Sequence, residues 1–257
     1  MTIRMKLHEA IVFATERHAG QKRKGTDIDY ICHPLEVAQI LGEMRPGDDD
    51  LIIAGVLHDL VEDGRATGEE ILRRFGPKAA NLVAAHTHSK EGTWMEQKQR
   101  ALLEIENAGS EVRLLVLADL TSNLRSMYAD HQALGEALWD RFNAGRTDQC
   151  NYYSDALDLM EDFQYDERAL YAYWEATELF KDIFVKYYID AKAGVIWQVC
   201  EASAWVFSKE TLDWEFSDEP VSPDAVEESR TMAETMEDHW KAAAGQANEA
   251  GGTAGLN

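Results

Sequence analysis

The 257-residue sequence lacks the features that mark a membrane protein or a secreted protein. It contains no uninterrupted run of about 18 apolar residues, so no membrane-spanning helix is expected. The N-terminal stretch from Met1 to His8 lacks the apolar segment of a signal peptide. Only three cysteines are present, Cys32, Cys150 and Cys200. Their odd number and wide spacing argue against a disulfide framework and predict a reducing, cytoplasmic environment.

Positive charge is also scarce, because 25 Lys and Arg stand against 47 Asp and Glu, a net charge of −22. The deficit is concentrated in residues 151–257, which hold 7 basic and 23 acidic side chains. Such an acidic surface repels phosphate groups, so neither nucleic acid nor an anionic membrane is an expected partner. The basic cluster Lys22-Arg23-Lys24 in the first half could still hold a small anionic ligand.

Apolar residues recur at helical spacing along about the first 165 residues, with no convincing strand pattern. The expected helices cover about 5–18, a segment opened by Pro34, and then 51–63, 67–76, 77–86, 93–106, 111–128, 131–143, 146–162 and 166–186. The interval from Gly20 to Tyr30 is expected to be a polar loop. This pattern predicts a mainly α protein with an all-helical, bundle-like domain over residues 1–187.

The pattern changes near Tyr188, where β-branched and aromatic residues become frequent. They predict a three- or four-stranded antiparallel meander over about 185–217. Ser222 and Pro223 are expected to cap and open a helix that runs to about Trp240. Residues 188–241 would then form a small β-meander and helix extension. The Ala- and Gly-rich residues 242–257 are expected to be a disordered tail.

One segment, Leu57-His-Asp-Leu-Val-Glu-Asp63, concentrates polar side chains at the end of an apolar helix. His58 and Glu62 are one helical turn apart, as are Asp59 and Asp63, so two columns of polar groups leave an apolar helix. Burying four such groups is unfavourable unless a partner compensates, and a cation is the obvious partner. A solvated helix end is the alternative interpretation.

Two further polar residues are candidates for the same site. His33 precedes a helix-opening proline, although histidines in that position are more often capping or surface residues. Asp119 lies in the most apolar helix of the chain, where a carboxylate is rarely unpaired. Two imidazoles and two carboxylates suit a six-coordinate Mn²⁺, Fe²⁺ or Mg²⁺-like ion, and a four-coordinate Zn²⁺ remains an alternative.

Three motifs, taken in order, resemble the HD-domain metal-dependent phosphohydrolases of the RelA/SpoT-homologue family. They are Gly20-Gln-Lys-Arg-Lys-Gly25 with Tyr30-Ile-Cys-His33-Pro-Leu-Glu-Val-Ala38, then Leu57 to Asp63, then Leu117-Ala-Asp-Leu-Thr-Ser-Asn-Leu-Arg125. The resemblance spans about residues 5–165 and is greatest to the stand-alone small alarmone hydrolases. It implies the removal of the 3′-diphosphate from guanosine tetra- and pentaphosphate alarmones, which are small nucleotide substrates.

The same resemblance implies a role for each matching position. It implies metal ligands at His33, His58, Asp59 and Asp119, catalytic carboxylates at Glu62 and Asp63, and substrate contacts at Arg23, Lys24, Asn123, Ser126, Arg146 and Tyr152. The implied cofactor is Mn²⁺ or another divalent transition metal. The chemistry is consistent, because a metal lowers the pKa of water, a carboxylate accepts its proton and cations receive the leaving pyrophosphate.

The sequence departs from the family pattern close to the expected metal. Leu120 replaces the usual Lys or Arg after the metal aspartate, and Thr87-His88-Ser89 replaces a Thr-Asp pair while adding His86 and His88. Lys98 could touch phosphates but fits better as a solvated residue of an amphipathic helix. The alternatives are a phosphohydrolase for another nucleotide or a phosphorylated cofactor, and a catalytically weak, metal-bound nucleotide sensor. The extension over 188–241 is expected to contribute to homo-oligomer contacts and not to catalysis.

Overall fold

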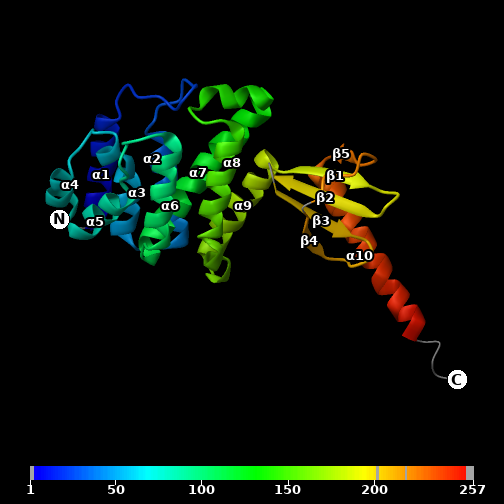
Figure 1. The fold of residues 1–257 in the computed structure, drawn as a ribbon. Coiled ribbons are helices and arrows are strands. Elements are labelled where there is room, and N and C mark those ends of the chain that lie inside the picture. Colours follow the sequence, from blue (N-terminus) through cyan, green and yellow to red (C-terminus); the bar gives the residue numbers. More distant parts are fainter. Residues whose placement is uncertain (1–2, 201–202, 218, 253–257) are drawn as a thin grey trace. The chain divides into compact units, whose positions relative to one another are not determined.

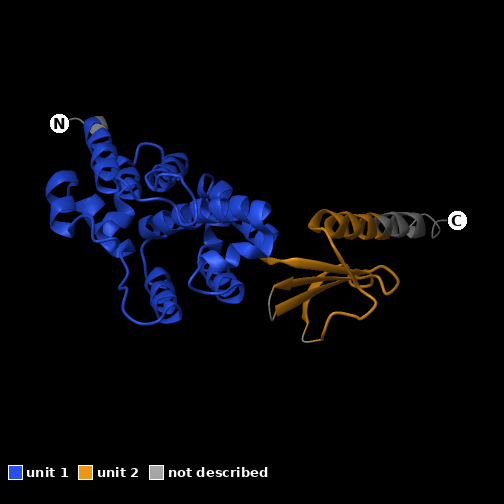
Figure 2. Cartoon of the chain, turned by 90° about the horizontal axis from the view of Figure 1, so that it is seen from above, with its two compact units in different colours: residues 1–183 blue, residues 184–257 orange. Residues whose placement is uncertain are grey.

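The computed structural model describes residues 3–200, 203–217 and 219–252, which form two compact units divided between Ile183 and Phe184 (Figure 2). Unit 1 is built from helices, and unit 2 combines an antiparallel sheet with a long helix (Figure 1). The expectation of a mainly α protein is confirmed. The sequence analysis places the division slightly later, at 187/188. Within the described residues, no helix is both long enough and apolar enough to span a membrane.

Unit 1 contains nine α-helices and two short 3₁₀ helices within its described residues. The elements are α1 (Ile3–Arg17), α2 (Cys32–Met44), α3 (Asp49–Glu62), α4 (Gly68–Phe75), α5 (Pro77–His86), α6 (Trp94–Glu106), α7 (Ser110–Leu134), η1 (Gly135–Arg141), α8 (Arg146–Asp158), η2 (Glu161–Tyr165) and α9 (Ala169–Phe184). One difference concerns α7, which continues to Leu134 where two helices were predicted. Residues 128–131 contain no helix breaker, and the chain turns only at Gly135, whose φ of 56° favours glycine.

Helix α3 is the centre of unit 1 and packs against α1, α2, α4, α5 and α7. Asp48 caps it by accepting a hydrogen bond from the backbone N–H of Leu51, and Asp49 and Asp50 occupy its first turn. Gly55 lets α2 approach closely, because a Cβ there would lie 2.6 Å from Leu41 Cδ1. This close packing sets the spacing between the polar side chains of α2 and α3.

The predicted start and end of α4 are confirmed. Thr67 accepts a hydrogen bond from the N–H of Glu70, as the capping pattern indicates. The helix ends at Gly76, where φ is 97°, and Pro77 then opens α5. The turn directs α5 back along α3, which brings the C-terminal end of α5 beside the polar end of α3.

Unit 2 contains strands β1 (Lys186–Asp190), β2 (Val195–Cys200), β3 (Ser203–Ser208), β4 (Trp214–Ser217) and β5 (Val226–Glu228), followed by α10 (Arg230–Gly252). The strands pair antiparallel in the order β4-β3-β2-β1-β5. The meander predicted with three or four strands is therefore present with four, and a fifth strand joins it. Its core is one cluster of buried residues, Tyr187, Ile189, Ile196, Phe207, Ala233 and Trp240. The helix therefore covers one face of the sheet.

Two predictions for the second half need correction. The helix expected from Pro223 begins only at Arg230, because residues 226–228 pair with the open edge of β1. The tail expected to be disordered from 242 is helical to Gly252, since alanine is the best helix former; residues 253–257 lie outside the described residues.

Candidate metal centre and active site

Three helices bring the four predicted metal ligands together. His33 lies in the first turn of α2, His58 and Asp59 lie near the end of α3, and Asp119 lies in the middle of α7. His58 is completely buried and His33 is 3% exposed. The apolar faces of the three helices form the core around the two histidines, while the side chains of Asp59 and Asp119 remain 19% and 22% exposed. The interpretation of 58–63 as a solvated helix end is therefore wrong for His58.

The ligand atoms face a common point. Nε2 of His33 lies 3.1 Å from Oδ1 of Asp119 and 3.6 Å from Oδ2 of Asp59. Nε2 of His58 lies 3.1 Å from Oδ2 of Asp59 and 3.8 Å from Oδ1 of Asp119. Neighbouring donors that are each about 2.0–2.2 Å from one ion are separated by similar distances. The four side chains therefore fit a single divalent cation.

Hydrogen bonds orient both imidazoles for metal binding. Nδ1 of His58 donates to the carbonyl of Gly55 at 2.8 Å. Nδ1 of His33 donates to Oγ of Ser122 at 2.9 Å, because Ser122 gives its own proton to Glu36 at 2.7 Å. Nε2 of His58 is buried and makes no hydrogen bond within the described residues. Each ring thus presents Nε2 to the cluster, as a metal ligand requires.

The charges in the cluster compensate one another. Burial disfavours the charged form of His58, yet the carboxylates of Asp59 and Asp119 raise its pKa to about 9. Burial likewise opposes ionisation of Asp119, but His33 and His58 hold the pKa of this carboxyl far below its usual range. Tyr30 donates to Oδ2 of Asp59 at 2.5 Å. The two carboxylates are therefore ionised, and a divalent cation between them would take the place of the proton that they favour on His58.

The two predicted catalytic carboxylates have different surroundings. Glu62 is one turn beyond His58 and accepts a hydrogen bond from the N–H of His88 at 3.3 Å. Burial raises the pKa of Glu62 above its usual value. Asp63 accepts hydrogen bonds from Gln21 at 3.0 Å and Lys90 at 3.1 Å. One carboxylate oxygen of Glu62 thus remains able to accept a further hydrogen bond. Both oxygens of Asp63 already accept hydrogen bonds from neighbouring segments of the chain.

Three of the predicted substrate residues adjoin the cluster. Nδ2 of Asn123 donates to Oδ1 of Asp119 at 2.8 Å, and Arg23 donates to Oδ1 of Asn123 at 3.3 Å. Arg23 and Ser126 line a cavity of about 290 Å³ that also includes His33. A pocket with a cation at its rim therefore opens beside the metal ligands.

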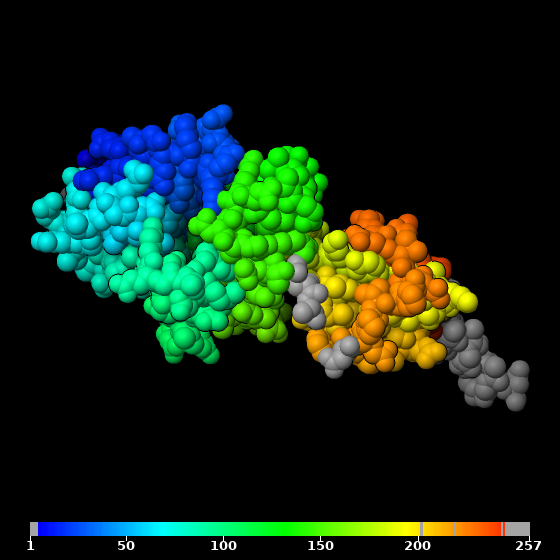
Figure 3. All heavy atoms as spheres, turned by 45° about the horizontal axis from the view of Figure 1, so that its top comes forward, coloured from blue at the N-terminus to red at the C-terminus, as the bar shows by residue number. Residues whose placement is uncertain are grey.

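The other predicted substrate residues stack on aromatic rings. Nζ of Lys24 lies 5.5 Å from the ring centre of Phe142, and the guanidinium of Arg146 lies 6.0 Å from that of Trp139. The loop that carries Lys24 lies against η1, as Figure 3 shows where blue meets green. The aromatic residues fix the direction of two flexible cations, which lowers the entropy cost of binding an anion.

Helix α6 contributes a residue that the sequence analysis treats as solvated. Nζ of Lys98 lies 4.2 Å from the ring centre of Tyr152, which meets Trp94 edge to face at 6.1 Å. Burial lowers the pKa of Lys98, and the carboxylates of Asp119 and Glu62 act in the opposite direction. Lys98 is therefore a half-buried cation near the cluster. The aromatic Trp94 one turn before it was the available sequence signal.

Two of the departures from the family pattern, His86 and Leu120, lie in the interior of unit 1. His86 is 7% exposed, its ring centre lies 5.2 Å from that of His58, and Nε2 lies 3.8 Å from Oδ2 of Asp119. Burial lowers the pKa of His86 to about 4, so the ring is neutral. Leu120 is 2% exposed and belongs to the core side of α7.

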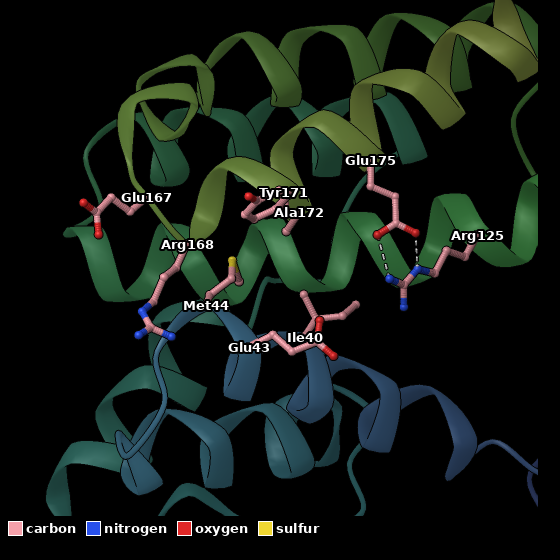
Figure 4. A pocket seen from close by; sticks show the side chains of 9 residues that line it. All are labelled: Ile40, Glu43, Met44, Arg125, Glu167, Arg168, Tyr171, Ala172 and Glu175. Carbon is pink, nitrogen blue, oxygen red and sulfur yellow. Dashed lines mark hydrogen bonds and ion pairs between the residues drawn. The ribbon is translucent and has the colours of Figure 1, made fainter.

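A polar network leads from His33 to a second cavity. Beyond Ser122, Glu36 accepts a hydrogen bond from Arg125 at 3.0 Å, and Arg125 binds Glu175 through two nitrogens at 2.7 and 2.6 Å. Arg125 and Glu175 form one end of a cavity of about 260 Å³ between α2, α7 and α9, with apolar side chains in its middle (Figure 4). Arg125 is therefore committed to two carboxylates and is not available to a phosphate group.

Comparison with known proteins places the chain among related enzymes. Residues 10–147 match the family described as HD domain. The chain is 38% identical over 121 residues to guanosine-3′,5′-bis(diphosphate) 3′-pyrophosphohydrolase MESH1 of Xenopus tropicalis, a match that covers 46% of this chain and 68% of the relative. It is 37% identical over 136 residues to a GTP pyrophosphokinase of Myxococcus xanthus, covering 49% of this chain but 17% of that much longer protein.

A solved structure agrees with these matches. The structure described as a metazoan ortholog of SpoT that hydrolyses ppGpp superimposes with a TM-score of 0.56 at 25% identity, and the match covers 68% of this chain and 93% of that chain. The matched family segment lies within unit 1 and includes all four predicted metal ligands. The chain therefore belongs to the HD-domain family, in the branch that includes the MESH1 proteins.

Proposed function

We propose that the chain is a metal-dependent phosphohydrolase that removes the 3′-diphosphate from guanosine-3′,5′-bis(diphosphate)-type alarmones. The observation that carries the proposal is the convergence of two oriented imidazoles and two ionised carboxylates beside a pocket rimmed by Arg23. Relatives named for this hydrolysis support the choice of substrate. The phosphates of such a nucleotide need the cations that line the pocket.

The proposed metal ligands are His33, His58, Asp59 and Asp119. A mixed nitrogen and oxygen donor set suits Mn²⁺ or another divalent transition metal. When bound, such an ion acts as a Lewis acid for a phosphoryl oxygen and lowers the pKa of water. The position of Nε2 of His58 supports this assignment, because this buried atom faces the carboxylates of Asp59 and Asp119 at 3.1 and 3.8 Å.

In the proposed reaction Glu62 accepts the proton of the attacking water. Its raised pKa makes it a better base than an exposed glutamate, because basicity increases with pKa. Four cations balance the negative charge of the substrate and of the leaving pyrophosphate, namely Arg23, Lys24, Lys98 and Arg146. We propose that Asn123 holds the ribose and that Ser126 and Tyr152 complete the nucleotide pocket.

Two further proposals concern organisation. We propose that unit 1 carries catalysis and that unit 2 mediates contact with a second copy of the chain. The matched family segment ends at residue 147 and thus excludes unit 2, which supports a separate role for it. A small nucleotide is the proposed ligand, and the charge of −22 argues against nucleic acid or an anionic membrane.

A metal-bound nucleotide sensor is the second candidate function. It is favoured by Leu120, a buried apolar residue in place of the family's cation next to the metal aspartate. Loss of that cation removes charge stabilisation from a transition state more than it weakens ground-state binding. Lys98 argues for the enzyme, because its half-buried ammonium group supplies positive charge near the same carboxylates.

The test combines metal analysis with a product assay. Purified protein supplied with Mn²⁺ is expected to bind about one ion per chain and to release pyrophosphate from guanosine-3′,5′-bis(diphosphate). Asp119→Ala should lose both properties, whereas Asp224→Ala, at an exposed position of unit 2, should keep both. Release of orthophosphate, or turnover of another nucleotide alone, would assign a different substrate. Tight nucleotide binding without turnover would assign the sensor function.

A further inference from the structure

His86 occupies an unusual place for a histidine. It is the last residue of α5, whose other buried residues are all apolar, namely Ala79, Ala80, Leu82 and Val83. This helix packs against α3 and α7, the two helices that carry His58, Asp59 and Asp119. Its apolar face and its final histidine therefore point to the same interior. A buried imidazole at that position requires polar partners.

Packing alone does not provide those partners. Nδ1 of His86 is buried and makes no hydrogen bond within the described part of the chain. Nε2 has Asp119 Oδ2 at 3.8 Å, which is too long for a hydrogen bond. The nearest rings are those of His58 at 5.2 Å and His88 at 5.9 Å between centres. Leaving a buried imidazole nitrogen without a partner is unfavourable, so a missing partner is the simpler explanation.

We propose that His86 is a fifth ligand of the metal centre. Ligand atoms of His58, Asp59 and His86 all lie within 4.8 Å of one another, as do those of His33, His58 and Asp119. The two groups share His58, and we place one ion between them. The inference rests on the metal centre of the proposed function and adds a residue that the resemblance does not imply.

This ligand changes the chemistry of the site. Three imidazoles and two carboxylates give a donor set richer in nitrogen, which favours a transition metal over Mg²⁺. Five protein ligands leave one position of a six-coordinate ion for water or substrate, where four ligands leave two. A neutral imidazole adds no charge, so His86 does not replace the cation that is absent at Leu120. The effect of His86 is therefore on metal choice and affinity.

The experiment measures metal binding without relying on turnover. Mn²⁺ and Co²⁺ dissociation constants are determined by titration calorimetry for the full chain, for His86→Leu and for His86→Gln. His88→Ala is the matched control, because the half-buried ring of His88 pairs with Glu104. We expect His86→Leu to weaken Mn²⁺ binding by at least about 10-fold, the scale of effects at metal-site residues. The visible absorption spectrum of bound Co²⁺ should change in both His86 variants and stay unchanged in His88→Ala.

The possible results distinguish failure of His86 as a ligand from failure of the proposed metal centre itself. Unchanged affinity and an unchanged Co²⁺ spectrum in both His86 variants would show that this ring only packs. Two ions in the wild type and one in His86→Leu would contradict a shared single ion. Failure of the wild type itself to bind either metal would overturn the metal centre as a whole. His86→Gln keeps a polar side chain at this position, so it guards against misfolding of the leucine variant. Circular dichroism of the metal-free proteins checks the fold.

Discussion

Nδ1 of His33 and Oγ of Ser122 are joined by a hydrogen bond of 2.9 Å between α2 and α7. The serine can accept this proton because its own hydroxyl donates to Glu36. Glu36 is fixed in turn by Arg125, which is clamped by Glu175 of α9. The proposed metal ligand His33 is thus oriented by a chain of groups from three helices.

Removal of Ser122 should weaken metal binding without removing any ligand. In Ser122→Ala the His33 ring loses the acceptor that holds Nε2 toward the carboxylates. Outer-shell changes of this kind cost about 10–100-fold in metal affinity, and we expect that range for Mn²⁺. Ser154→Ala, at a half-buried position of α8, is the control. Equal affinities in the three proteins would show that the ring is held by packing alone.

Glu62→Gln should separate chemistry from binding. The amide retains the shape of the side chain but cannot accept a proton, so turnover should fall by about 10²–10⁴-fold while bound metal is unchanged. Glu69→Gln, at an exposed position in α4, should retain wild-type turnover. Turnover of Glu62→Gln at the wild-type rate would assign the proton acceptor to another group.

The wild-type pH profile gives a second test of Glu62. Burial raises its pKa above 4.5, and only the ionised form accepts a proton. The rate should therefore fall as pH decreases through that raised pKa, so the acidic limb of kcat/KM lies above the usual range for glutamate. The residual activity of Glu62→Gln should lack this limb. A limb at or below the ordinary pKa of glutamate would contradict the assignment.

The sequence predicts the site better than it predicts the second unit. His33, His58, Asp59 and Asp119 stand out because a polar residue in an apolar helix needs a partner, and this rule operates locally. Their meeting point depends on how α2, α3 and α7 pack. The sequence does not display that packing directly, although Gly55 permits the close approach of α2 to α3.

The errors have the same origin. Residues 226–228 have helix-compatible neighbours, yet they form a strand because β1 offers an unpaired edge. The sequence predicts that Lys98 is solvated. In the structure Lys98 lies against Tyr152, which is more than 50 positions later in the chain. His86 is noted in the sequence as an addition, but only its position beside His58 gives it a chemical meaning. Each outcome depends on a tertiary partner.

The pair Arg45–Asp166 should make stability depend on pH. Arg45 donates to both oxygens of Asp166, which also accepts from the N–H groups at the start of α9. The hydrogen bonds from Arg45 lower the pKa of Asp166 to about 2, against an opposing effect of burial. A carboxyl whose pKa is lower in the folded state stabilises the fold above its ordinary pKa, near 4. That contribution is lost as pH falls toward 2.

Asp166→Asn should therefore destabilise unit 1 by about 1 kcal/mol at neutral pH, since the partly exposed pair is screened by solvent. The difference from wild type should shrink between pH 4 and pH 2 in urea unfolding curves. The neighbouring exposed Glu167→Gln should show no such difference. A constant difference across this pH range would mean that the charge of Asp166 is not the cause.

Unit 2 presents an aromatic surface suited to self-association. Trp205 and Phe216 are paired across β3 and β4 and meet edge to face at 6.1 Å between ring centres. They share a sheet face with Phe207 and Trp214, which α10 covers, yet Trp205 is 37% exposed and Phe216 is 60% exposed. Exposed neighbouring aromatic rings are typical of interface cores.

Phe216→Glu should therefore lower the molar mass measured by light scattering while leaving metal content and turnover intact. The new charge opposes burial of that surface in an interface with a second copy of the chain. Unit 2 keeps its core because position 216 is outside the buried cluster.

Trp240→Ala is the contrasting variant. It empties a core position of unit 2 and should cost about 3–5 kcal/mol, which would unfold that unit. A truncation after Lys186 should likewise change the mass and retain metal-dependent hydrolysis by unit 1. An unchanged mass in Phe216→Glu would exclude this surface as the interface, and loss of hydrolysis on truncation would assign unit 2 a part in the active site.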